Sequence, residues 1–138
     1  MKTFLSRGSL CFAGGAAGGL TNSIVVWACG ALGVSAALGV VISPTLSPGW
    51  LYPRLVWGGL WGLLMLLLPA RRNLWLGGLA ASLAPSAVQL LLVFPLVAHK
   101  GWLGLELGTL TPLLVLTFNA VWGLTLAWWL ATTDTQRA

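Results

Sequence analysis

The sequence contains very few groups that could carry out acid–base or metal chemistry. Its 138 residues include only two carboxylate side chains, Glu106 and Asp134, and a single histidine, His99. A hydrolytic triad needs its nucleophile, base and acid within hydrogen-bond reach of one another. A zinc site needs three or four converging ligands, which one histidine and the distant cysteines Cys11 and Cys29 cannot supply. We therefore expect no enzyme activity, no metal site and no cofactor.

Charge is scarce along the whole chain. Only 7% of the residues are charged and 58% are hydrophobic, whereas soluble domains are about 25% charged. The apolar runs are continuous and long enough to cross a bilayer, which takes roughly 20 residues per helix. They lack the alternating pattern of a membrane barrel. The sequence predicts an all-α integral membrane protein with four transmembrane helices, at about 18–42, 51–68, 74–98 and 110–131.

The few basic residues are distributed unevenly between the two sides of this layout. Lys2, Arg7, Arg71, Arg72 and Arg137 fall on one side, and Arg54 and Lys100 fall on the other. Short cytoplasmic loops carry an excess of lysine and arginine. We expect both termini in the cytoplasm, in a bacterial-type inner (plasma) membrane, with the lipid bilayer as the main partner. No basic patch is present, which argues against nucleic-acid binding.

No predicted span contains an aspartate, glutamate or histidine. Proton relays and cation-coupled pumps depend on such groups within the membrane. Small multidrug transporters, which are of similar length, use a glutamate in their first helix. The absence of a carboxylate from the first span excludes that family.

Two halves of the chain resemble each other. GGLTNS at 18–23 matches GGLAAS at 77–82, and PRLV at 53–56 matches PLLV at 112–115 with the same separation. Internal repeats of this kind indicate how a fold is built.

A duplication would make 14–68 and 73–131 two helical hairpins of the same orientation. They would be related by a pseudo-twofold axis along the membrane normal. Asn22 aligns with Ala81 and so departs from the repeat.

Glycines recur four residues apart, as in the pairs Gly14 with Gly18 and Gly58 with Gly62. In a membrane helix this spacing places both glycines on one face and lets another helix approach closely. The pattern predicts a helix-packing face. It leaves open whether the neighbouring helix belongs to the same chain or to another copy.

Several polar side chains fall inside the predicted spans, among them Ser23, Thr117 and Thr125. The candidates for a polar contact or a path are Asn22, Ser82, Ser86, Gln89 and Asn119. An amide without a partner is costly in lipid, so these side chains must face protein or water. Their two interpretations are hydrogen bonds between helices and the lining of a solute path.

Arg54 is the one charge at the head of a span. It could form an ion pair with Glu106 in the outer loop, or extend its charged end toward the lipid headgroups.

Two functions remain compatible with this sequence. The first is a structural or accessory component that packs with copies of itself or with another membrane protein. The second is an oligomeric channel or facilitator for an uncharged or weakly charged solute.

Overall fold

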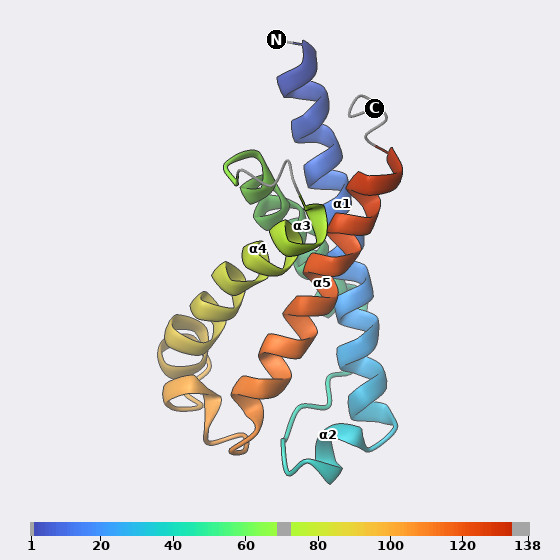
Figure 1. Cartoon of the computed structure of the whole chain (residues 1–138). Coiled ribbons are helices and arrows are strands. Elements are labelled where there is room, and N and C mark those ends of the chain that lie inside the picture. Colours follow the sequence, from blue (N-terminus) through green and yellow to red (C-terminus); the bar gives the residue numbers. More distant parts are fainter. Residues whose placement is uncertain (1, 69–72, 134–138) are drawn as a thin grey trace.

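The computed structural model describes residues 2–68 and 73–133, and every regular element in these ranges is helical (Figure 1). Three helices are long and apolar enough to cross a membrane, at Phe4–Ala31, Leu74–Val97 and Thr111–Thr133. Arg71, Arg72, Asp134 and Arg137 lie outside the described residues. In chain order the elements are α1 (Lys2–Ala31), α2 (Val34–Ala37), α3 (Pro48–Gly62), the 3-10 helix η1 (Leu63–Leu66), α4 (Leu74–Val88), the π-helix η2 (Gln89–Val97), the 3-10 helix η3 (Trp102–Gly104) and α5 (Thr111–Thr133).

Helix α1 is displaced toward the N-terminus from the expected span at 18–42. It includes the glycine-rich segment that precedes Gly18 and ends at Ala31. Gly33 has a φ of 80° and Gly39 a φ of 72°, a left-handed conformation that glycine adopts readily and that interrupts a helix. Hydropathy could not locate this end, because the residues beyond it are as apolar as the helix itself.

Helices α3 and α4 both begin at capping residues that the sequence supplies. The Ser47 hydroxyl accepts a hydrogen bond from the Trp50 amide at 3.3 Å, and Pro48 follows in the first turn, where a missing N–H costs nothing. The side chain of Asn73 accepts from the amides of Trp75 and Leu76. Such caps satisfy amides that have no partner within the helix.

Beyond Val88 the helix continues as η2, with i→i+5 hydrogen bonding. Pro85 lies before this change and Pro95 lies within it. Proline removes an N–H from the helical ladder, and π-helical segments are rare and often lie at functional sites. The expected span at 74–98 therefore coincides with α4 and η2 together, and the expected span at 110–131 with α5.

The packing contacts between the four long helices run in the order α3, α1, α5, α4. Helix α1 packs against both α3 and α5, and α4 packs against α5, whereas α3 and α4 barely touch. The start of α1 and the end of α5 lie at the same end of the molecule, opposite α2.

This arrangement departs from a twofold relation between the two hairpins. An exact twofold that exchanges α1 with α4 and α3 with α5 would pack α3 against α4 as closely as α1 packs against α5. The divergence of α3 from α4 breaks that relation, so the duplication of 14–68 and 73–131 stays a prediction from sequence.

The glycines of the predicted packing face lie against helices of the same chain. A Cβ built at Gly14 would come within 2.8 Å of the Trp129 ring, and one at Gly18 within 2.7 Å of the Trp122 ring, both on α5. On α3, Gly58 lies against the backbone of Gly15 and Gly62 against the carbonyl of Cys11 in α1. Helix α1 thus packs against α5 through Gly14 and Gly18 and against α3 through Gly15.

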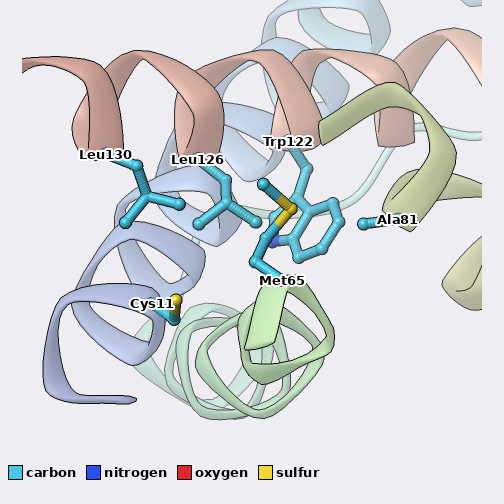
Figure 2. Packing of buried hydrophobic residues seen from close by; sticks show 6 residues of the cluster. All are labelled: Cys11, Met65, Ala81, Trp122, Leu126 and Leu130. Carbon is cyan, nitrogen blue, oxygen red and sulfur yellow. The ribbon is translucent and has the colours of Figure 1, made fainter. Parts of the chain in front are cut away.

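The largest buried cluster lies where these helices cross. Figure 2 shows its six residues, which are Cys11, Met65, Ala81, Trp122, Leu126 and Leu130. The Trp122 ring reaches from α5 toward Met65 and Ala81, and its indole Nε1 donates to the Gly15 carbonyl at 3.0 Å. A buried tryptophan needs a partner for its N–H, and a carbonyl of α1 supplies one here.

Candidate functional site

Asn22 joins three helices through a single amide group. Its Nδ2 donates to the carbonyl of Phe118 at 2.6 Å and to Oδ1 of Asn119 at 3.3 Å, both on α5. Its Oδ1 accepts from Nη2 of Arg54 on α3 at 2.6 Å. The side chain is only 6% exposed, so its polar atoms are satisfied by protein rather than by water.

Three groups hold the Arg54 guanidinium in place. Besides the bond to Asn22, its Nε donates to Oγ of Ser23 at 2.8 Å. Ser23 is fully buried and donates in turn to the Gly19 carbonyl at 2.6 Å. The guanidinium also lies over the Trp50 ring, 4.6 Å from its centroid, a cation–π contact.

The polar contacts continue from Asn119 into α4. The Asn119 Nδ2 donates to Oγ of Ser86 at 3.0 Å, and that hydroxyl donates to the Ser82 carbonyl at 2.7 Å. The Ser82 hydroxyl donates to the Leu79 carbonyl at 2.6 Å. One line of hydrogen bonds therefore connects α3, α1, α5 and α4.

Gln89 is the exception among the predicted polar residues. It is half-buried, and within residues 2–68 and 73–133 its side-chain amide forms no hydrogen bond. It occupies the first position of η2 and lines the same cavities as Arg54. Both its donor and its acceptor are therefore free for a bound molecule or water.

A cleft of about 480 Å³ lies between α3 and α4, where these two helices diverge. Its polar lining residues are Asn22, Arg54, Gln89 and Asn119, and its apolar lining residues include Trp57, Trp61, Pro85, Val88, Val93 and Trp122. Ligand sites in proteins are typically 300–1,000 Å³, largely apolar, with a few well-placed polar groups. The cleft has this character.

A smaller cavity of about 120 Å³ shares the four polar residues of the cleft. Trp50, Val115 and Phe118 are among its other lining residues. Arg54 therefore borders both spaces.

The structure does not join Arg54 to Glu106. Glu106 lies in the loop after η3, beside Gly101, and no ion pair links it to Arg54 in the described part of the chain. Arg54 instead turns toward α1, because the hydroxyl and amide of Ser23 and Asn22 lie at the same level of the bundle. No cluster of three or more histidine, cysteine, aspartate or glutamate side chains occurs in the described ranges.

Sequence reasoning missed Ser23 and Trp50 as parts of this site. Trp50 lies four residues before Arg54, a spacing that places both on one face of a helix, so that contact could have been predicted. Ser23 gave no such signal, since its role depends on the register between α1 and α3.

Comparison with known proteins adds no relative. No family model, curated protein or solved structure matches the chain.

Proposed function

We propose that the protein is a non-catalytic membrane protein that binds an amphipathic, lipid-like molecule in the cleft between α3 and α4. The observation that carries this proposal is the cleft itself, whose lining is mostly apolar and includes a hydrogen-bonded group of polar side chains, Asn22, Arg54 and Asn119. An amphiphile matches this division, because its chain would cover the tryptophans and aliphatic side chains while its head met the polar groups.

The proposal includes a fourth membrane crossing, formed by α3 and η1. Fifteen α-helical and four 3-10 residues rise about 30 Å together, the thickness of the hydrocarbon core. The segment runs antiparallel to α1, with Arg54 beside Gly19 at one end and Leu66 beside Gly8 at the other. Four crossings agree with α1 starting and α5 ending at the same end.

In this arrangement the cleft faces the bilayer sideways. Its wall residue Trp57 is 59% exposed, and the divergence of α3 from α4 gives a chain in the membrane a route of entry. We propose a bacterial-type inner membrane with cytoplasmic termini, following the bias of the basic residues. The polar lining residues of the cleft would then lie in the outer half of the membrane.

The two functions considered from sequence fit the geometry less well. An accessory role through the glycine faces would need those faces to be free, and they are covered by α1, α3 and α5 of the same chain. A solute path lined by Asn22, Ser82, Ser86, Gln89 and Asn119 would need their polar groups to be available. All of these side chains except Gln89 already bond to one another, to Arg54 or to backbone.

Photo-crosslinking tests the proposed binding directly. The full chain would be placed in phosphatidylcholine nanodiscs with hexadecanol carrying a diazirine in its chain, irradiated, digested and mapped by mass spectrometry. We expect adducts concentrated on residues of α3 and η2 that line the cleft. Adducts spread evenly over the lipid-facing surface would contradict the proposal.

Two tryptophan substitutions on η2 give a matched comparison. Val93→Trp would fill the cleft, because Val93 lines it. Val97→Trp would add the same ring to the lipid-facing surface of the same element, where Val97 is 73% exposed. We expect the first to lower cleft adducts several-fold and the second to leave them unchanged.

A further inference from the structure

We infer that the head of the bound amphiphile is an oxyanion, a carboxylate or a phosphate, and that the free end of the Arg54 guanidinium binds it. The inference rests on the proposed function and assigns the chemical class of the ligand. It begins with the charge of Arg54, which no carboxylate balances in the described part of the chain. The whole sequence has only two carboxylates.

The hydrogen bonds of Arg54 leave a specific set of donors unused. A guanidinium has five N–H groups. One on Nε bonds to Ser23 and one on Nη2 bonds to Asn22, which occupies one edge of the group. Both N–H groups on Nη1 and the second on Nη2 have no partner among the described residues. One N–H of Nη1 and the free N–H of Nη2 form the terminal fork that pairs with two oxygens of a carboxylate or phosphate.

The guanidinium is also fixed before any ligand arrives. Trp50 stacks against it, and Asn22 is itself held by the Phe118 carbonyl. Buried Ser23 fixes the Nε end. A receptor whose groups are already ordered loses less entropy on binding, so this geometry suits an anion-binding role better than a mobile side chain would.

The two spaces beside Arg54 limit the kind of anion that its free N–H groups can bind. Arg54 borders both the cleft and the smaller cavity. The smaller cavity, at about 120 Å³, exceeds the roughly 10–15 Å³ that one water molecule needs. A head bound at Arg54 would place its chain along Trp57 and Val93, which line the same cleft as Arg54. Free Gln89 can complete the contacts to the head.

The test compares ligands that differ only in the head. The full chain in phosphatidylcholine nanodiscs would be titrated with hexadecanoate, hexadecyl phosphate and hexadecanol as competitors of the diazirine probe, and with inorganic phosphate as a head without a chain. We expect both anionic amphiphiles to bind at least tenfold more tightly than hexadecanol. We expect inorganic phosphate to compete weakly, because the chain supplies much of the contact.

Variants identify the group responsible. Arg54→Gln should abolish the preference for anionic heads and retain hexadecanol binding, and Arg54→Lys should keep a weaker preference, since an ammonium lacks the fork. Lys100→Gln is the matched control, because it removes a cation from the outer loop and should change nothing. If Arg54→Gln does not fold, Gln89→Glu places a carboxylate in the same cavities and should lower anion binding at least tenfold.

The outcomes separate the two proposals. Equal binding of hexadecanol and hexadecanoate to the unmodified protein would overturn the anionic head and leave the proposed amphiphile binding intact. Binding of neither would overturn both. Tight binding of inorganic phosphate alone would show a free-anion site and overturn the lipid-like ligand.

Discussion

Asn22 is the residue on which the polar site depends. A lone asparagine in an apolar helix indicates a polar contact, and the sequence allowed that much to be predicted. Its partners could not be predicted, because Arg54 and Phe118 are distant in the chain and meet it only through the packing of three helices. The ion pair with Glu106, one of the two alternatives considered for Arg54, shows the same limit, since it assumed contact between residues on one side of the membrane.

Replacing Asn22 with leucine should destabilise the protein by about 1–3 kcal/mol. The change leaves Arg54 without one acceptor in a buried setting, and unsatisfied buried groups cost about this much. Interhelical hydrogen bonds in membranes contribute only about 0.6 kcal/mol on average. The measurement is unfolding in detergent by circular dichroism.

Thr117→Val is the matched control for Asn22→Leu. The Thr117 hydroxyl bonds only to the Leu113 carbonyl of its own helix and is exposed. We expect a change within about 0.5 kcal/mol. Equal effects of the two substitutions would show that Asn22 has no special place in the bundle.

Trp122 provides a second test at the same scale. Trp122→Phe keeps an aromatic ring in the cluster of Figure 2 but removes the donor to the Gly15 carbonyl and some ring volume. We expect a loss of about 1–2 kcal/mol, from one hydrogen bond and a small cavity. Trp128→Phe, at a side chain that is 53% exposed, should have little effect in the same unfolding assay.

At the scale of the helices, glycine determines which surfaces meet. Helix α1 packs closely against α3 through Gly15 and against α5 through Gly14 and Gly18. Sequence spacing predicted a packing face on α1 at Gly14 and Gly18. It could not distinguish packing within the chain from packing between chains, because the spacing is the same in both.

Gly58→Ala should therefore loosen the contact of α3 with α1 rather than dissociate an oligomer. The new Cβ would lie 2.6 Å from the Gly15 carbonyl oxygen, and overpacking of this kind costs about 1–3 kcal/mol. Unfolding in detergent, followed with size-exclusion chromatography, measures both effects.

Gly8→Ala is the matched control, because it adds the same methyl group to α1 at a position that has room for it. Its Cβ would meet only Leu66, at 3.9 Å, and alanine favours a helix by up to about 1 kcal/mol. The variant should be as stable as the parent or slightly more so. Greater destabilisation by Gly8→Ala than by Gly58→Ala would contradict the packing described here.

At the scale of the whole molecule, the number of crossings determines where the termini lie. Three crossings place them on opposite sides of the membrane, and four place them on the same side. The proposed crossing by α3 and η1 therefore has a direct consequence for topology.

Epitope tags at both ends should be protected from protease in intact cells with a permeabilised outer membrane, and should be cut in inverted inner-membrane vesicles. Both tags should respond together, because four crossings return the chain to its starting side. Tags that respond oppositely would rule out α3 as a crossing. Tags that are both cut in intact cells would reverse the orientation.

The sequence by itself determined the helical class of this protein and the lipid environment that its apolar helices require. Apolar runs with almost no charge cannot fold in water, and in lipid the backbone must satisfy its own hydrogen bonds. The caps at which α3 and α4 begin, Ser47 and Asn73, are also local features of the sequence.

The tertiary structure alone decided where α1 ends, which glycines meet, and where Arg54 points. It also opened the cleft, because α3 and α4 diverge while α1 and α5 pack closely. These features depend on the register between helices far apart in the chain. Hydropathy does not encode that register, since nearly every lipid-facing and core-facing position here is equally apolar.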